Sequence, residues 1–405
     1  MPFDTSVKFL DRTTPPHIFT LVLLAGVSAM NMSIFLPSLP AMTREFGTSY
    51  GVMQLSVSLY LACTALTQLF VGPISDKFGR RPVILAAIGI FILATIGCMT
   101  ATSIEVFLIF RMVQATVAVA MVVSRAIVRD MFSQEQSAAM IGYVTMGMSL
   151  VPMFAPAIGG LLDEAFGWRA TFLFLILFGM ALGTLCYFDQ GETNRSGGMG
   201  FKAQLAEYPE LFTSRRFWGY ALAAAFSSGA FFAFLGGAPY VATEVYGMPS
   251  TAVGIFFGVP AVGYFFGNYI SARLSVQVGI DRMIVIGGSI LTLGMALSLL
   301  LTFAGFGSAY LFFGFCTFVG IGNGMVLPNA SAGLLSVRPH LAGTASGVGS
   351  AIMIGGGAAL SALAGTLLQL GGGSYPLQWI MLISSVGCLA AIFYVKQRAK
   401  TVAAT

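Results

Sequence analysis

Long apolar stretches alternate with short polar ones along the whole chain. A helix that crosses the hydrocarbon core of a bilayer needs about 20 mostly apolar residues. Twelve stretches fit this template, six before a polar segment and six after it. They cover 17–40, 51–71, 82–102, 104–126, 137–162, 168–188, 217–241, 250–274, 283–303, 308–335, 341–369 and 375–395. The pattern predicts an all-α integral membrane protein whose twelve transmembrane helices form two pseudo-symmetric six-helix bundles.

The polar stretches divide the chain into five parts. We expect an N-terminal tail at 1–16, a first bundle at 17–188, a linker at 189–216, a second bundle at 217–395 and a tail at 396–405. The later part of the linker, Phe201 to Phe212, is expected to form a short amphipathic helix at the membrane surface. The polar N-terminal tail lacks the features of a cleavable signal peptide, so the first apolar stretch is expected to remain as a helix.

Composition and charge support a membrane location and indicate an orientation. Hydrophobic residues make up 57% of the chain and charged residues only 9%, whereas a soluble domain carries about 25% charged residues. Most of the 20 basic residues lie in the loops on the side of the termini, while Arg44 and Arg169 lie on the other side. Because cytoplasmic loops are enriched in Lys and Arg, both termini are expected on the cytoplasmic side of the membrane. The net charge of +5 follows from this bias and does not indicate a nucleic-acid partner.

Residues that hold metals or catalyse reactions are scarce. All five cysteines lie in apolar stretches, and no CxxC motif or Cys/His cluster occurs. The two histidines, His17 and His340, lie at the expected cytoplasmic edge. The sequence therefore predicts no metal site and no cofactor. It also lacks the intramembrane Asp, Glu and His pairs that a membrane-embedded enzyme would need, although an enzyme or a non-transporting receptor is the rival from another class.

The most specific local motif runs from Gly72 to Pro82, between the second and third expected helices. Asp76 and Arg80 are four residues apart, a spacing that allows an ion pair if the helix continues. Gly72 allows close approach of another helix, and Gly79 allows a turn with positive φ. Topology alone explains Arg80 and Arg81, since basic inner loops are common. It does not explain the glycines and the aspartate at this spacing.

This run resembles the G-x-x-x-D-x-x-G-R-[RK] signature of the major facilitator superfamily, which also has two bundles of six helices. In that family the loop aspartate and arginine join an acidic residue at the inner end of the fourth helix. Asp130 stands at that place here. The resemblance implies a charge latch built from Asp76, Arg80 and Asp130, with Gly72, Gly79 and Arg81 in the same motif, that holds the outward-open state.

Arg111 is the one charge that the pattern places clearly within a helix. A charge at membrane depth is costly unless it faces water or a partner, so a functional role is the first interpretation. Gln114 shares its helix face. The pair resembles the R-x-x-Q-G motif of the same family, with Ala115 in place of the glycine. The alternative is a structural arginine near the outer membrane interface.

The fifth expected helix carries a row of small residues and prolines. The row resembles the antiporter-associated motif G-x8-G-x3-G-P-x2-G-G, although Val151 and Ala155 replace two glycines. Four positions fit the motif: Gly142, Pro156, Gly159 and Gly160. A generic small-residue packing seam is the alternative interpretation.

The second half repeats these features more weakly. Gly279 and Asp281 occupy an inner loop like that of the first motif, and Asn323 and Pro328 are expected to break the tenth helix. With the Leu-Pro-Ser-Leu-Pro run at 36–40, the whole chain is most similar to the bicyclomycin/chloramphenicol-resistance (Bcr/CflA) group of drug:proton antiporters.

One departure concerns proton coupling. Relatives of that group have an acidic residue in the first helix at the position that Ser33 occupies here, beside Asn31. Proton coupling normally needs a group that titrates at membrane depth, and none is evident in the first bundle. Aromatic walls with few fixed charges suit hydrophobic ligands, and Arg111 favours neutral or anionic ones. The expected substrate cavity includes Asn31, Ser33, Arg111, Gln114, Phe234 and Asn323.

These features and the resemblance together predict a monomeric secondary transporter. We expect it to export small hydrophobic, neutral or anionic compounds by alternating access, with protons as the coupling ion and membrane lipid as its surroundings. An uptake or facilitative carrier for an endogenous metabolite is the alternative within the same fold. The sequence does not name the substrate.

Overall fold

The computed structural model is built from α-helices, and no strand occurs in the described part of the chain. It describes residues 7–132, 134–194, 209–338 and 341–404. Side chains fall outside the description at 134–139, 141–143, 145–150, 153, 342–343 and 398–404. Most of the expected amphipathic linker helix lies outside the described residues, and 209–213 are helical.

The first bundle contains the helices before the linker. They are α1 (Ile18–Ser33), the 3₁₀ helix η1 (Leu36–Ser38), α2 (Leu39–Glu45), α3 (Tyr50–Phe78), α4 (Arg80–Thr100), α5 (Ile104–Val113), the 3₁₀ helix η2 (Gln114–Val117), α6 (Ala118–Met131), α7 (Gln134–Phe166) and α8 (Arg169–Asp189). We call these elements the N bundle.

The helices after the linker form the C bundle. They are α10 (Arg215–Tyr240), the π-helix η3 (Val241–Val245), α11 (Ser250–Phe256), α12 (Gly258–Val278), α13 (Ile280–Leu301), the π-helix η4 (Thr302–Phe306), α14 (Ala309–Val337), α15 (Ala342–Gln369) and α16 (Tyr375–Ala404). Because α16 continues to Ala404, most of the expected C-terminal tail is helical.

Serine caps set where several helices begin. The hydroxyls of Ser49, Ser103 and Ser308 each accept the backbone N–H three residues further on, at 3.3 to 3.4 Å. Such a cap satisfies one of the first N–H groups of a helix, which have no partner within the helix. The short turns that the sequence predicts near residues 103 and 305 are therefore present, each with a serine at the start of the following helix.

The transmembrane segments match the hydrophobic pattern. Among the described residues, eleven helical segments are long and apolar enough to cross a membrane. The further long helix, α7, has 33 residues, many with side chains outside the description, and it corresponds to the fifth expected span. Eleven of the twelve predicted membrane helices are thus confirmed among the described residues, and the chain is a multi-pass membrane protein.

The first and fourth spans change helix geometry along their length, whereas the break expected in the tenth span is absent. Pro37 and Pro40 stand where the first span changes from α1 through η1 to α2, as expected when proline removes a backbone donor. The fourth span changes to 3₁₀ geometry at Gln114–Val117. The predicted break at Pro328 is wrong, because α14 continues through this residue.

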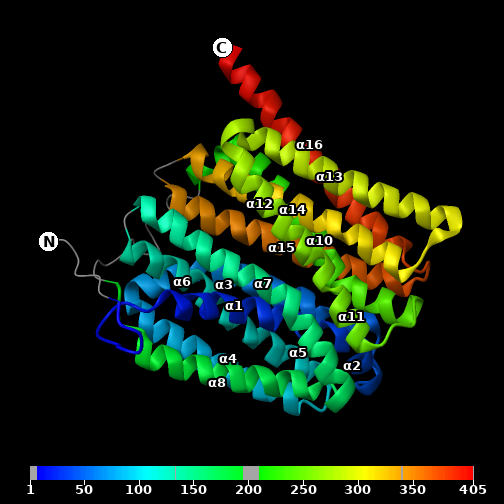
Figure 1. The fold of residues 1–405 in the computed structure, drawn as a ribbon, viewed down its shortest axis with the longest axis horizontal. Helices are drawn as coiled ribbons and strands as arrows, with labels where there is room; N and C mark the ends of the chain where they lie inside the picture. Colours follow the sequence, from blue (N-terminus) through cyan, green and yellow to red (C-terminus); the bar gives the residue numbers. More distant parts are fainter. Residues whose placement is uncertain (1–6, 133, 195–208, 339–340, 405) are drawn as a thin grey trace.

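The two bundles lie side by side. In Figure 1 the elements from α1 to α8 form the lower layer and those from α10 to α16 the upper layer. Between them α3 packs along α15, and α7 packs against α11 and α12. The chain enters α1, turns from α3 to α4, leaves α8 and turns from α12 to α13 on one side of the protein. We call this the terminal side and the opposite one the far side.

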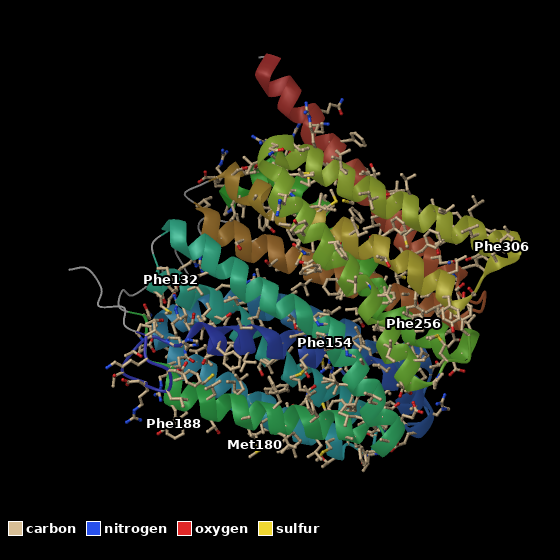
Figure 2. The ribbon with its side chains drawn as sticks, in the orientation of Figure 1. Phe132, Phe154, Met180, Phe188, Phe256 and Phe306 are labelled. Atoms are coloured by element: carbon tan, nitrogen blue, oxygen red, sulfur yellow. The ribbon has the colours of Figure 1, made fainter. Side chains whose placement is uncertain are left out.

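The outer surface of the helices is apolar. Large hydrophobic side chains are exposed along most spans, and Figure 2 labels four of them, Phe154, Met180, Phe188 and Phe306. A soluble protein rarely exposes contiguous apolar surface on this scale. The exposed side chains are therefore expected to face lipid.

Candidate functional site

The first candidate site is the turn between α3 and α4. Gly79 stands there with φ 94° and ψ 153°, a conformation that residues with a side chain rarely adopt. Its N–H donates to the carbonyl of Ser75 at 3.1 Å, which ends α3. A Cβ on Gly79 would lie 2.5 Å from an Oε2 atom of Glu192. Glycine is thus needed here both for the backbone angle and for the close carboxylate.

This turn brings three predicted charges together. Arg80 Nη1 lies 2.5 Å from Asp76 Oδ1, and Arg80 Nε lies 3.1 Å from Asp130 Oδ2 at the end of α6. The Arg80 side chain is only 9% exposed, and it also donates to the Ser75 hydroxyl. Removing Arg80 would leave the carboxylates of Asp76 and Asp130 without their shared counter-ion. We call Asp76, Arg80 and Asp130 the latch.

Two other residues of the motif lie outside the latch. Arg81 donates from Nη2 to the carbonyl of Tyr187 at 2.9 Å, and its guanidinium lies 5.3 Å from the centroid of that ring. It therefore ties α4 to α8. At Gly72 an added Cβ would meet no atom within 4 Å. The expected close helix approach at Gly72 is absent in this conformation.

The second candidate site surrounds Arg111, which is 1% exposed. Its Nη1 donates to Asn31 Oδ1 at 2.9 Å and to Gln114 Oε1 at 2.7 Å. Its Nη2 donates to the Asn31 carbonyl at 2.9 Å and its Nε to the Ser56 carbonyl at 3.2 Å. Four bonds to neutral acceptors from α1, α3 and η2 thus hold the guanidinium.

Aromatic rings close the remaining sides of this arginine. The guanidinium carbon lies 4.2 Å from the ring centroids of both Phe35 and Tyr60, within the range of cation–π attraction. Gln114 is fixed in turn, since its Nε2 donates to Thr95 Oγ1 at 2.7 Å. No carboxylate pairs with Arg111 in the part of the chain that the structure describes. We call Arg111 and its contacts the arginine cage.

The other predicted cavity residues do not join the arginine cage. The Ser33 hydroxyl donates to the Ala29 carbonyl of its own helix at 2.8 Å. Phe234 packs in the C bundle, with its ring centroid 4.9 Å from that of Phe257. Asn323 Oδ1 accepts from the Ser227 hydroxyl at 2.6 Å, also in the C bundle. All three are buried, so of the six predicted cavity residues Asn31, Arg111 and Gln114 are the ones joined by hydrogen bonds.

The small residues of α7 lie at close helix contacts. A Cβ on Gly159 would be 1.7 Å from the Ile34 carbonyl oxygen, and a Cβ on Gly160 would be 2.4 Å from the Ser250 carbonyl oxygen. A Cβ on Gly254 of α11 would likewise be 2.3 Å from the Pro156 carbonyl oxygen. The surroundings of the fourth motif residue, Gly142, lie outside the description. The seam therefore joins α7 both to the first span and to the C bundle.

Polar contacts join the two bundles at the far side. Tyr50 Oη donates to the Gly236 carbonyl at 2.7 Å. Gln54 Nε2 donates to the carbonyl of Ser361 at 3.0 Å and to its hydroxyl at 2.6 Å. An ion pair of Arg44 with Glu244, at 3.2 Å, adds to them at the surface.

The same interface is looser toward the terminal side. A Cβ on Gly365 would lie 2.3 Å from Gln54 Cγ, so α15 and α3 are tightly packed near the far side. Nearer the terminal side, the closest atom to a Cβ on Gly355 or Gly347 would be 4.0 Å away. The bundles are therefore closed against one another at the far side.

Sequence reasoning missed several of these residues. Gln54 looks like an ordinary helix residue, and its partner Ser361 is 307 positions away. Glu192 falls in the polar segment at 189–216, which predicts a linker but no contact with α4. The distribution of basic residues groups Arg125 with the inner loops, yet it lies within α6, half-buried. A polar residue within an apolar stretch was the available signal for Gln54 and Arg125, but it does not identify the partner.

Two bundles of six spans with a charged turn in the first bundle define a polytopic membrane protein of the kind that moves solutes between two helical halves. The model of the Major Facilitator Superfamily matches residues 21–362. The chain therefore belongs to the Major Facilitator Superfamily of transporters.

Named relatives cover nearly the whole chain. It is 29% identical over 360 residues to the bicyclomycin resistance protein homolog of Haemophilus influenzae, covering 88% of this chain and 90% of that protein. It is 30% identical over 363 residues to multidrug resistance protein D of Escherichia coli K12, with the same coverage. It is 30% identical over 326 residues to the chloramphenicol resistance protein of Pseudomonas aeruginosa, covering 80% and 77%.

Solved structures support the fold. A D-xylose–proton symporter superposes with a TM-score of 0.72 at 13% identity, covering 93% of this chain and 96% of that one. A bacterial homolog of the human lysosomal transporter Spinster, in an inward-facing and occupied conformation, has a TM-score of 0.69 at 16% identity, covering 95% and 96%. The major facilitator fold expected from the sequence is confirmed.

Proposed function

We propose that this protein exports small hydrophobic, neutral or anionic organic compounds, drugs among them, across the bacterial inner membrane. The observation that carries the proposal is its likeness to three proteins named for drug resistance over at least 80% of the chain. The protein acts as a carrier and not as an enzyme. It works as a monomer in the lipid bilayer without a cofactor.

The mechanism is alternating access between the two bundles. Both termini, and hence the terminal side, lie in the cytoplasm, in accord with the distribution of Lys and Arg. The contacts at Tyr50, Gln54 and Arg44 then close the periplasmic end in this conformation. A substrate from the cytoplasm enters between the bundles and leaves after these contacts open.

The latch controls the cytoplasmic end. Asp76, Arg80 and Asp130 hold the ends of α3, α4 and α6 together. The open space at Gly72 is where a helix of the C bundle approaches when the cytoplasmic end closes. The latch is intact although the periplasmic end is closed, so its ion pairs alone do not hold the outward-open state. It favours that state when the C-bundle helix packs against it at Gly72, and without the latch the cytoplasmic end opens more readily.

The arginine cage sets the substrate preference. A buried guanidinium with neutral partners repels cations and attracts anions or strong hydrogen-bond acceptors. The lack of an acidic residue at Ser33 removes the usual attraction for a cationic drug. Export is coupled to the entry of protons, as in the drug:proton antiporters that the chain resembles.

The test is expression in a bacterial strain without its own efflux pumps. Cells with the protein should tolerate more chloramphenicol and bicyclomycin than cells with an empty vector, and a protonophore should remove the difference. Energised import of the same compounds, or equal accumulation in both strains, would contradict export. Saturable transport that a protonophore does not change would favour the facilitative carrier.

A further inference from the structure

Glu192 lies three residues beyond the end of α8, yet its carboxylate lies at the first turn of α4. Oε1 accepts the N–H of Arg80 at 2.9 Å, and Oε2 accepts the N–H of Arg81 at 3.1 Å. These are among the first N–H groups of α4, which have no partner within the helix, and a negative charge is favoured there. Glu192 thus caps α4 from a segment more than 100 residues away.

The two residues that follow contact the other parts of the latch. The Thr193 hydroxyl donates to Asp130 Oδ2 at 3.2 Å. Asn194 Nδ2 donates to the Asp76 carbonyl at 2.6 Å, and its N–H donates to Glu192 Oε1 at 2.9 Å. Three consecutive residues therefore contact the three helices that carry the latch.

This segment is fixed on the side of the N bundle. Asp189 at the end of α8 is fully buried. Its carboxylate accepts from the N–H of Leu10 at 2.7 Å, the N–H of His17 at 2.9 Å and the hydroxyl of Thr20 at 2.7 Å. Gly191 N–H donates to the Thr14 carbonyl at 3.1 Å. Residues 192–194 consequently start from a rigid base.

The other end of the linker is tied to the C bundle. Glu210 forms an ion pair with Arg338, at the end of α14, at 3.2 Å. The linker thus contacts the latch where it begins and the C bundle where it ends. Both contacts belong to the one chain segment that connects the two bundles.

We propose that Glu192, Thr193 and Asn194 are positioning residues of the latch, through which the linker adjusts it. The inference rests on the proposed role of the latch in closing the cytoplasmic end. Glu192 fixes the backbone of Arg80, so that the guanidinium stays between Asp76 and Asp130. When the segment moves away, Arg80 loses its fixed position and the latch weakens.

The test combines a distance measurement with a double-mutant cycle. Spin labels on Lys77→Cys and Val276→Cys, both exposed on the terminal side of the two bundles, report the separation there. The five native cysteines are replaced in this background, and the full-length protein is reconstituted in lipid nanodiscs. Export of chloramphenicol is measured in parallel in cells.

Glu192→Ala should shift the distances toward wider separation, as is also expected of Asp130→Asn, and should lower export several-fold. Because both changes act on the latch, the double variant should be little worse than Asp130→Asn alone. Glu192→Gln should be intermediate, since its amide oxygen still accepts one N–H. The matched control is Glu105→Ala, which removes a carboxylate from the first turn of another helix, outside the linker, and should leave the coupling between Glu192 and Asp130 unchanged.

Two outcomes would overturn the inference and leave the proposed role of the latch unaffected. One is an unchanged distance distribution in Glu192→Ala together with a clear shift in Asp130→Asn. The other is full additivity of Glu192→Ala and Asp130→Asn, which would indicate an ordinary helix cap. If Asp130→Asn itself leaves the distances unchanged, the latch proposal fails and the inference fails with it. The distance measurement stays informative even if chloramphenicol is not a substrate.

Discussion

The turn between α3 and α4 and the turn between α12 and α13 occupy corresponding places in the two bundles. Gly79 has φ 94° and ψ 153°, and Gly279 has φ 88° and ψ 146°. Each donates its N–H to a serine four residues earlier, Ser75 at 3.1 Å and Ser275 at 2.9 Å. The backbone of the two turns is therefore the same.

Their side chains differ completely. Val276 and Ile280 stand where the N bundle has Asp76 and Arg80, counted from the glycine. The carboxylate nearest to the second glycine in sequence belongs to Asp281, which accepts from Tyr220 Oη at 2.7 Å. The C-bundle turn thus has a hydrogen bond from a hydroxyl to a single carboxylate in place of an enclosed cluster of three charges.

This difference separates what the turn needs from what the proposed role of the latch needs. A helical hairpin of this kind requires the glycine with positive φ, and both bundles have it. Because the C bundle makes its turn without an ion pair, the charges of the latch are dispensable for the turn. The arginine cage follows the same division, since the N bundle buries Arg111 while the C bundle holds the neutral pair of Ser227 and Asn323.

The largest effect is expected from Arg111→Ala, which removes the buried charge that distinguishes the N bundle from the C bundle. It removes four hydrogen bonds and leaves Asn31 Oδ1 and Gln114 Oε1 without this donor. One lost bond to a charged group is worth about 1.5–3 kcal/mol, so export should fall by at least about tenfold. Drug susceptibility and the amount of protein in the membrane are measured together. Gln378→Leu, a buried amide change in the C bundle, is the control and should retain export. Full export by Arg111→Ala would contradict a role for this residue.

Replacing the two glycines by alanine tests the shared backbone. Such φ and ψ values cost a residue with a side chain about 1–3 kcal/mol. Gly79→Ala should lose more stability than Gly279→Ala, because its Cβ would also lie 2.5 Å from Glu192 Oε2, whereas the space at Gly279 is open. Thermal unfolding in detergent measures both losses. Equal shifts in the unfolding temperature would show that the approach of Glu192 does not matter.

Asp76→Asn compared with Asp281→Asn tests the difference in charge. The first variant removes an ion-pair partner of Arg80 and should shift the protein toward the inward-open state. A partly exposed pair contributes about 1 kcal/mol, so export should fall roughly fivefold. Asp281→Asn keeps an oxygen that accepts from Tyr220 and should have little effect. Spin-label distances on the terminal side and drug export are the measurements. Similar results for both variants would remove the functional distinction between the turns.

The smallest effect is expected from Tyr220→Phe. It deletes one hydroxyl and its hydrogen bond to Asp281 while keeping the buried ring. Stability should fall by about 0.5–1 kcal/mol, visible as a small shift in thermal unfolding, with export unchanged. A strong loss of export would show that the C-bundle turn also acts in gating.

Much of the architecture was accessible from the sequence because it depends on local pattern. Apolar stretches of the length of a bilayer gave the twelve spans, and the polar segment at 189–216 separated the bundles. The spacing of Asp76 and Arg80 predicted an ion pair that the structure contains at 2.5 Å. The apolar stretch around Arg111 likewise placed this charge within a helix, where the structure buries it.

Lateral contacts were not accessible in the same way. In a bilayer, lipid and neighbouring helices are similarly apolar, so hydrophobicity does not tell which face of a helix meets another helix. The enclosure of Arg111 by Phe35 and Tyr60, the contact of Gln54 with Ser361 and the burial of Phe234 among C-bundle rings all depend on such faces. For the same reason the open space at Gly72 contradicted an expectation based on its residue type.

The sequence by itself thus determined that this protein spans the membrane in two sets of six helices, and it identified Asp76, Arg80 and Arg111 as unusual charges. Only the tertiary structure decided what these charges meet. It placed Asp130 beside Arg80, as the family resemblance had implied, it added the contacts of the start of the linker, and it gave Arg111 neutral partners from three segments. Hydropathy reports the free energy of transferring each residue from water to an apolar phase, one residue at a time. Partner choice depends on shape and hydrogen bonding between helices that are distant in sequence.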